Sequence, residues 1–389
     1  MRQLLTGARL FTGDSILDGH ALLIEDGRIL DLIPHQAAAQ AEVVSLPAGS
    51  LLAPGFIDTQ VNGGGGALLN DTPTADAVRT IVAAHRRYGT TGLLATFITD
   101  SSDKTHAAAA AVAETARTPA SGVLGLHLEG PFLSQERRGV HSPAFIRAPT
   151  ADDIAYLAAL PNAFPDGRVL LSLAPETVCD ADIRTLAAAG LLLAGAHSAA
   201  SYARTVAAIQ AGVSGFTHLF NAMPPLANRE PGIAGAALMS AETWCGIIVD
   251  GIHVHPAALK LALAAKPRGK LMLVTDAMTP LGTDATRFQL YGATIHRRDG
   301  RLVTDDGTLA GADLDMAQAL RNCIALLDLP REEALRMASL YPAEFLGMAD
   351  RRGRLAPGYQ ADLTLLDQSD HVLGTWVAGG WRASDHTDA

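Results

Sequence analysis

The sequence predicts an α/β protein: a (β/α)8 TIM-like barrel with a small β-domain formed from both chain termini. Two observations predict it. In the middle of the chain, eight short apolar runs end in polar residues and alternate with Ala-rich helical segments. At the two ends, short strand-like runs are separated by Asp-Gly and other turn signals. Near-continuous apolar strands that alternate with helices are typical of a parallel sheet, and eight repeats of this unit are typical of a closed barrel.

The two ends of the chain have the same pattern of short strand-like runs separated by turns. Residues 1–50 contain "RQLLTGARLFTG" and "GHALLIEDGRILDLI", and the C-terminal segment contains "GRLAPGYQADLTLLDQ" and "HVLGTWVAGGWRA". We expect residues 1–52 and 354–389 to form one small β-domain, and residues 53–353 to form the catalytic barrel.

The barrel strands are expected in the eight apolar runs. In chain order these are residues 52–63, 90–99, 122–131, 168–176, 191–198, 215–223, 245–254 and 270–278. The competing open, doubly wound sheet is disfavoured because no GxGxxG follows the first run. The Gly-rich stretch at 62–70 lacks the Lys-Ser/Thr of a phosphate-binding P-loop, so it predicts only a loop with unusual backbone angles.

Composition excludes several classes of function. The 389 residues carry a formal net charge of −10 with no block of Lys or Arg, so nucleic acid is not an expected partner. No apolar run reaches the ~18–20 residues of a membrane span, and the first residues do not look like a signal peptide, so we expect a cytoplasmic protein without membrane contact. Cys179, Cys245 and Cys323 are isolated, which predicts neither disulfides nor a cysteine zinc site.

The active site of such a barrel lies at the C-terminal ends of its strands, so polar residues that close the runs are candidates. They are Asp58, Gln60, Asn62, Glu129, Glu176, His197, His218, Asn221, Asp250, His253, His255 and Asp276. Seven histidines fail this test and are expected at the surface: His20, His35, His85, His106, His296, His371 and His386.

One carboxylate and two imidazoles stand out in this set. Glu129, His197 and His218 match the ligand number and type of a catalytic divalent metal site that keeps a position open for water. A single histidine in an apolar run is usually a core residue, but three such groups without partners would be costly to bury. Asp276 could then serve as the general base for water. Glu176 and Asp250 could instead hydrogen-bond a neighbouring loop or orient a metal ligand.

Several motifs carry a family resemblance. The segments "APGFIDTQVNG", "GLHLEGPF", "GAHS", "THLFNAMPPLANREPGIAGAAL", "LVTDAM" and "GTLAGADLDM" resemble those of the N-acetylglucosamine-6-phosphate deacetylases of the amidohydrolase superfamily, in register from about residue 47 to 365. The resemblance implies removal of the N-acetyl group from N-acetylglucosamine 6-phosphate, an amino-sugar phosphate. It also implies a homodimer and the same barrel with a small β-domain.

The resemblance also implies a role for individual residues. Glu129, His197 and His218 would bind the metal, Asp276 would be the acid/base, and His141 would polarise the amide carbonyl. The substrate phosphate would meet Asn221 and Ala222, together with Arg229 and His253 contributed across the dimer interface. Leu309, Ala310, Gly311 and Ala312 would border the acetyl group.

One departure from the superfamily predicts a single metal ion per subunit. Many amidohydrolases carry His-x-His on the first strand and a carbamylated Lys on the fourth, but here the first position reads Gln60-Val61-Asn62. None of the four lysines, Lys104, Lys260, Lys266 and Lys270, closes a strand. Carboxamides bind divalent metals poorly. Zinc is the expected ion, although iron, manganese and cobalt tolerate the same ligands.

Three alternatives remain at this point. The first is the same chemistry on N-acetylgalactosamine 6-phosphate, which differs in the orientation of one hydroxyl. The second is another amide or lactam hydrolase on this scaffold. The third is a catalytically dead barrel that serves as a structural or interaction protein, which the presence of all four metal-site and base residues disfavours.

Overall fold

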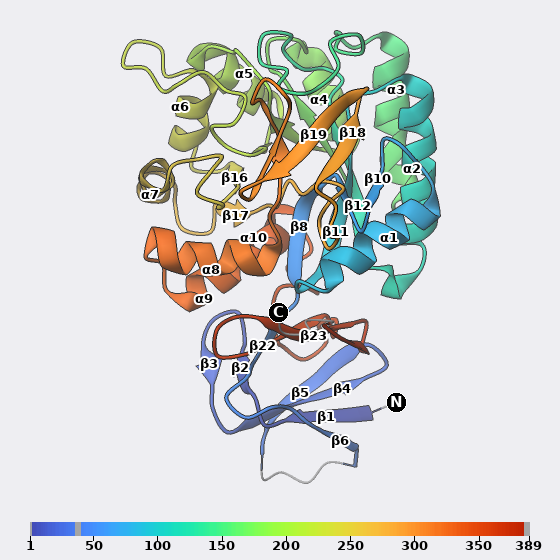
Figure 1. Ribbon diagram of the computed structural model, residues 1–389, viewed down its shortest axis with the longest axis vertical. Helices are drawn as coiled ribbons and strands as arrows, with labels where there is room; N and C mark the ends of the chain where they lie inside the picture. The colour runs from blue at the N-terminus through green and yellow to red at the C-terminus, as the bar shows by residue number, and fades with distance from the viewer. Residues whose placement is uncertain (1, 36–39, 385–389) are drawn as a thin grey trace.

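The protein is described by a computed structural model that covers residues 2–35 and 40–384. Eight parallel strands form its central sheet (Figure 1). They are β8 (Phe56–Val61), β11 (Thr90–Ile98), β12 (Val123–Glu129), β13 (Arg168–Leu173), β14 (Leu192–Gly195), β15 (Gly215–Phe216), β16 (Trp244–Ile247) and β17 (Leu271–Leu273). Each strand overlaps one of the eight predicted runs.

The strands pair in chain order, and the ends of the sheet meet. A parallel bridge between Val61 and Ala277 connects the segment after β17 to β8. The strands β8, β11 and β12 are buried along their whole length, because side chains of the barrel interior cover one face and helices cover the other. The predicted (β/α)8 barrel is therefore confirmed.

The helices follow the strands as the repeat requires. They are α1 (Ala75–Arg86), α2 (Ser102–Ala116), α3 (Ala151–Ala159), α4 (Asp180–Ala188), α5 (Tyr202–Ala211), α6 (Gly232–Met239), α7 (Pro256–Ala265), α8 (Met316–Leu327), α9 (Arg331–Ala338) and α10 (Leu340–Phe345). Short 3-10 helices occupy Pro119–Ser121 and Leu160–Ala163. Polar caps begin several of the helices; at α3, Thr150 and Asp153 form a reciprocal capping box. Among the described residues, no helix is long and apolar enough to cross a membrane.

A four-stranded antiparallel sheet is inserted after β17. It contains β18 (Arg287–Leu290), β19 (Ala293–Arg298), β20 (Arg301–Val303) and β21 (Leu309–Ala312). A two-stranded ribbon, β9 (Gly63–Gly64) and β10 (Ala67–Leu68), follows β8. Figure 1 shows β18 and β19 on the part of the barrel away from the small domain. The sequence analysis did not predict this sheet.

The small β-domain is built from both ends of the chain, as predicted. One sheet has the order β5-β4-β1-β6 and the other has the order β24-β23-β22-β7-β2-β3, so strands from both ends share the second sheet. The N-terminal strands are β1 (Arg2–Thr6), β2 (Arg9–Phe11), β3 (Ile16–Leu17), β4 (His20–Glu25), β5 (Arg28–Pro34), β6 (Glu42–Ser45) and β7 (Leu51–Pro54); the C-terminal strands are β22 (Leu363–Leu366), β23 (Val372–Val377) and β24 (Gly380–Ala383).

The core of this domain also mixes the two ends, with Leu5 and Leu22 in the same buried cluster as Leu363 and Trp376. In Figure 1 the blue and dark red strands lie together beneath the barrel. The exact boundaries at residues 52 and 354 stay a prediction.

One prediction about the histidines is wrong. His85 was expected at the surface, but it is 1% exposed and its Nε2 contacts the carbonyl oxygen of Gly63 at 2.9 Å. His85 lies on the buried face of α1. The test used above considers only the ends of strands, so it does not detect a histidine that is buried by its position on a helix. His386 lies outside the described residues.

Candidate functional site

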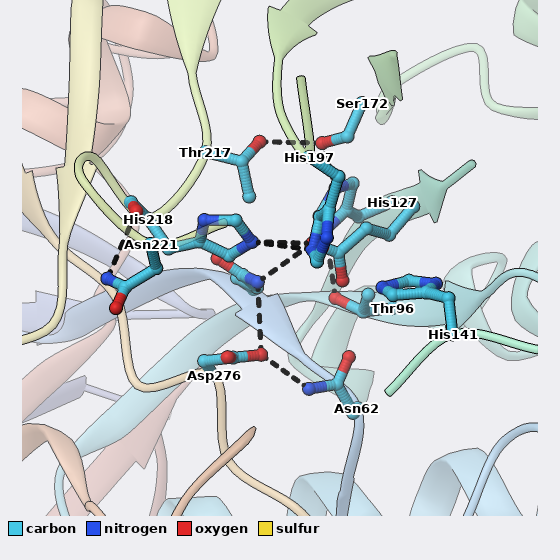
Figure 2. A network of polar contacts seen from close by, with 12 residues as sticks. Asn62, Thr96, His127, His141, Ser172, His197, Thr217, His218, Asn221 and Asp276 are labelled. Carbon is cyan, nitrogen blue, oxygen red and sulfur yellow. Dashed lines mark hydrogen bonds and ion pairs between the residues drawn. The ribbon is translucent and has the colours of Figure 1, made fainter. Parts of the chain in front are cut away.

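Three potential metal ligands converge at the C-terminal ends of the barrel strands. Glu129 is the last residue of β12, and His197 and His218 follow β14 and β15. Glu129 Oε1 lies 3.0 Å from His218 Nε2 and 3.4 Å from His197 Nε2, and the two Nε2 atoms are 3.1 Å apart (Figure 2). Tetrahedral ligands held at ~2.0–2.1 Å from a zinc ion would be about 3.3 Å from one another. The three atoms therefore have the spacing of a metal site.

The contacts of the two ring nitrogens of His197 also suit a metal ion at this point. His197 Nδ1 lies 2.9 Å from the carbonyl oxygen of Arg137, which can only accept, so Nδ1 carries the hydrogen. The Nε2 lone pair of a neutral His197 then faces the carboxylate of Glu129. Two electron-rich atoms at this distance repel each other unless a proton or a metal ion lies between them. The donor set thus fits a divalent metal.

His141 is a further candidate near this set. Ligand atoms of Glu129, His141 and His197 lie within 4.8 Å of one another. That spacing is looser than the 3.0–3.4 Å of the set with His218, and Nδ1 of His141 is already 3.0 Å from the hydroxyl of Thr99. We therefore take Glu129, His197 and His218 as the set that could hold a metal.

The backbone at these positions is strained. His197, His218 and Asp276 have φ angles of 44°, 33° and 53°, in the left-handed region that residues with a Cβ rarely adopt. Such conformations persist where the surrounding structure holds them, and they cluster at functional sites. The sharp turn after each strand aims the side chain into the barrel mouth.

Two carboxamides hold Asp276. Asn62 Nδ2 and Gln60 Nε2 donate to the same oxygen, Asp276 Oδ1, at 2.7 and 3.0 Å (Figure 2). From the sequence, these residues are expected only to be poor metal ligands in place of imidazoles. Their position shows a second consequence: they orient the carboxylate and leave Oδ2 as the oxygen with free acceptor capacity.

Burial and neighbouring groups shift the pKa values of both carboxyl groups in the site. Burial by itself would raise the pKa of Glu129, but its contacts with the imidazoles of His197 and His218 outweigh burial and hold the pKa well below its usual range. Burial, and then the negative charge of Glu129, raise the pKa of Asp276 to about 6. A carboxyl group with such a pKa can both accept and release a proton near neutral pH.

Asp58 supports Asp276 from beneath. It is fully buried, and it accepts hydrogen bonds from the hydroxyl of Thr275 at 2.5 Å and from the backbone N–H of Gln60 at 3.1 Å. Burial raises the pKa of Asp58 to about 7. Its contacts connect the end of β8 to the residue before Asp276, so Asp58 belongs to the support of the site and not to its cavity.

A polar layer crosses the barrel interior below Glu129. His127 lies two residues earlier on β12, on the same face, and its Nδ1 and Nε2 contact Thr96 Oγ1 at 3.1 Å and Ser172 Oγ at 2.7 Å. Ser172 Oγ in turn lies 2.6 Å from Thr217 Oγ1 (Figure 2). Burial lowers the pKa of His127 to about 4, so the ring stays neutral. The layer satisfies polar groups that have no access to water.

A cavity of about 350 Å³ opens above these groups. Most of the residues predicted for the site line it: Asn62, Glu129, His141, His197, His218, Asn221, Ala222, His253, Asp276, Leu309 and Gly311. Ala310 and Ala312 are buried on the opposite face of β21, because side chains alternate along a strand. Arg229 is exposed and is not among the lining residues.

The remaining strand-end candidates have structural partners. The exposed Glu176 accepts hydrogen bonds from Ser198 Oγ and Ala199 N, both at 2.7 Å. Asp250 Oδ2 lies 2.6 Å from His253 Nδ1, and His255 caps α7. Glu176 and Asp250 thus contact groups next to the site, which is the alternative that the sequence analysis left open for them.

Sequence comparisons give the family context. The amidohydrolase family matches residues 51–382, and the NagA composite domain matches residues 4–46. A Shewanella protein named N-acetylgalactosamine-6-phosphate deacetylase is 43% identical over 376 residues, covering 96% of this chain and 94% of the relative. A Haemophilus influenzae protein named N-acetylglucosamine-6-phosphate deacetylase is 32% identical, covering 98% of this chain and 100% of the relative.

A solved structure gives the same picture. N-acetylglucosamine-6-phosphate deacetylase from Pasteurella multocida superposes with a TM-score of 0.94 at 33% identity, over 98% of this chain and 100% of that one.

The geometry predicts which carboxylate controls metal binding. Glu129→Gln should lower the affinity for zinc by at least about a hundredfold, since it removes the negative charge and leaves two neutral imidazoles. Glu176→Gln is the matched control, because Glu176 also follows a barrel strand but binds only Ser198 and Ala199. Competition with a chromophoric chelator measures both. Equal zinc affinity in the two variants would contradict the ligand set.

Proposed function

The chain belongs to the amidohydrolase family, and from this premise we propose that it is a metal-dependent hydrolase of N-acetyl-D-glucosamine 6-phosphate. The products are D-glucosamine 6-phosphate and acetate. The observation that carries the proposal is the pairing of the Glu129, His197 and His218 set with an oriented, buried carboxylate, Asp276, in one cavity. Amide hydrolysis needs both an electrophilic centre and a group that moves protons.

One metal ion per chain would be held by Glu129, His197 and His218. When bound, such an ion supplies Lewis-acid activation of water and of the carbonyl group. Gln60 and Asn62 direct their N–H groups at Asp276, which supports a single ion because an N–H donor offers no lone pair to a metal. Zinc suits the mixed carboxylate and imidazole ligands, as do iron, manganese and cobalt.

Asp276 would carry both proton transfers. Its Oδ1 is occupied by Gln60 and Asn62, so Oδ2 is the atom that accepts the proton of the attacking water. The same carboxyl group then gives that proton to the amide nitrogen, which must be protonated before it leaves as an amine. His141 lines the cavity beside this group and would contact the substrate amide.

The phosphate end of the site would lie near Asn221, Ala222 and His253, which line the cavity. The resemblance places His253 and Arg229 together across the dimer interface, but His253 lines the cavity of its own chain. Arg229 is exposed and would reach the phosphate from the partner in a homodimer. Leu226, three residues before Arg229, is 56% exposed, and Met239, at the end of α6, is 72% exposed.

N-acetylgalactosamine 6-phosphate is the second candidate substrate. The name of the Shewanella relative, at 43% identity, favours it. The two sugars differ in the orientation of one hydroxyl, and the chemistry at the amide is the same. Selection between them therefore depends on groups that contact that hydroxyl.

The role of Asp276 predicts a sharp separation of metal binding from turnover. Asp276→Asn should keep bound metal but lose ~10⁴-fold or more in kcat, since the amide cannot accept or return a proton. In the parent protein the carboxyl group must be ionised to act as a base, so kcat/KM should fall as the pH falls through about 6. A bound cation would lower the pKa of Asp276 and move this fall to a lower pH. Full metal content with a kcat within about tenfold of the parent would contradict this role.

The role of Arg229 predicts an effect on substrate affinity. Arg229→Ala should raise KM for the phosphorylated substrate. Its kcat/KM should fall by an amount that corresponds to about 2–4 kcal/mol of lost transition-state stabilisation, with little change for the unphosphorylated sugar. Arg184→Ala, an exposed arginine on α4, is the control. A mixed dimer of Arg229→Ala and Asp276→Ala chains should regain one working site if Arg229 acts across the interface. Inactive mixed dimers would refute sharing.

Acetate release tests the substrate proposal itself. We expect the highest kcat/KM for N-acetylglucosamine 6-phosphate and a much lower value for N-acetylglucosamine. A higher value for the galacto 6-phosphate would establish the second candidate. Absence of acetate release from both phosphates by metal-loaded protein would refute the proposal.

A further inference from the structure

One wall of the cavity is apolar. The side chains of Ile98, Val140, Met278 and Leu309 line it. Ile98 and Met278 are 3% and 2% exposed, and both belong to a buried cluster that includes residues of the inserted sheet β18–β21. The wall suits a hydrocarbon part of a ligand, because contact with it removes apolar surface from water.

This wall lies directly beside the carboxylate that would act on the amide. Met278 comes two residues after Asp276, and both side chains line the cavity. Ala277, between them, is 0% exposed and forms parallel bridges to Val61 and Ala312. The backbone at this point is thus held by strands on both sides, with Asp276 and Met278 at alternate positions on the cavity side.

The polar end of the cavity lies in another part of the barrel. Asn221 and His253 follow β15 and β16, whereas Ile98 is the last residue of β11. The strands β11 and β15 are four positions apart in the ring of eight, so their ends face each other across the barrel mouth. A substrate with its phosphate near Asn221 and its amide at Asp276 would direct its acyl group towards Ile98 and Met278.

The side chain of Met278 has little room to move away from the cavity. A Cβ at Gly311 would lie 2.4 Å from Cγ and 2.9 Å from Sδ of Met278, so the methionine packs directly on the backbone of β21. The φ angle of Gly311 is +65°, which also favours glycine. Phe288, Ile295 and Leu302 of the inserted sheet belong to the same buried cluster as Met278.

We propose that Met278 sets the length of the acyl group that the enzyme accepts. Its side chain closes this end of the cavity behind an acetyl group, with Ile98 beside it. One extra methylene group in an apolar pocket changes kcat/KM by about 10–200-fold, and a propanoyl or butanoyl group would need the space that Met278 fills. This inference rests on the proposed function and adds to it the residue that selects among N-acyl groups.

Amine release from the N-acetyl, N-propanoyl and N-butanoyl forms of the hexosamine 6-phosphate that the parent hydrolyses faster tests this role. In the parent, kcat/KM should fall with each added methylene group. Met278→Ala removes the atoms beyond Cβ and should raise the ratio of kcat/KM for the N-butanoyl to the N-acetyl substrate by at least about tenfold over the parent. Met278→Leu fills a similar volume and should keep the preference of the parent.

Ile295→Ala is the matched control. Ile295 is 1% exposed in the same cluster as Met278 but does not line the cavity, so its truncation loosens the cluster without lengthening the acyl site. Its ratio should stay close to that of the parent, with zinc content and Tm measured for every variant. A ratio in Met278→Ala no higher than in Ile295→Ala would overturn the proposal.

A crystal structure of the zinc-loaded parent with bound acetate tests the same role without a variant and without turnover. We expect the acetate methyl group within ~4.5 Å of the Met278 side chain. A methyl group directed at Asn221 instead would overturn the proposal. Metal-loaded protein that releases no amine from any of the sugars would refute the proposed function, whereas an unchanged acyl preference in active Met278→Ala protein would refute the role of Met278 alone.

Discussion

The buried negative charge of Glu129 is the constraint on which the rest of the site depends. An ionised carboxylate with 2% exposure would be unstable in the barrel without compensation, and the two imidazoles of His197 and His218 converge on it to within 3.4 Å. The same charge raises the pKa of Asp276, which lies close enough to feel it. In the proposed reaction, metal binding and proton transfer are therefore coupled through one side chain, and changing it should affect both.

The barrel satisfies this constraint by bringing short polar segments together at one end of its sheet. Gln60 and Asn62 from β8 and its neighbouring residue direct N–H donors at Asp276, and Asp58 connects β8 to Thr275. The superfamily pattern described in the sequence analysis implies two imidazoles on the first strand, which would help to hold a second ion. Here the carboxamides face the base instead, so the position on the first strand orients a carboxylate.

The sequence allowed much of this to be predicted, because strand runs and strand ends follow from period and position. Glu129, His197, His218 and Asp276 were found because each closes an apolar run. The contacts of Gln60 and Asn62 with Asp276 were not predicted, since a carboxamide near the end of an apolar run does not show which side chain it will contact. The sheet β18–β21 was not predicted. Its strands lie between the last barrel strand, β17, and the helix α8, and they carry polar residues such as Arg298 and Arg301 in place of an apolar run.

The location of the metal is the most direct test of the account, and anomalous diffraction from zinc-loaded crystals at the zinc absorption edge measures it. We expect one peak per chain, within ~2.0–2.2 Å of Glu129 Oε1, His197 Nε2 and His218 Nε2, with Gln60 and Asn62 still directed at Asp276. A second peak of similar occupancy between Gln60, Asn62 and Asp276 would contradict it, as would a metal that binds His141 in place of His218.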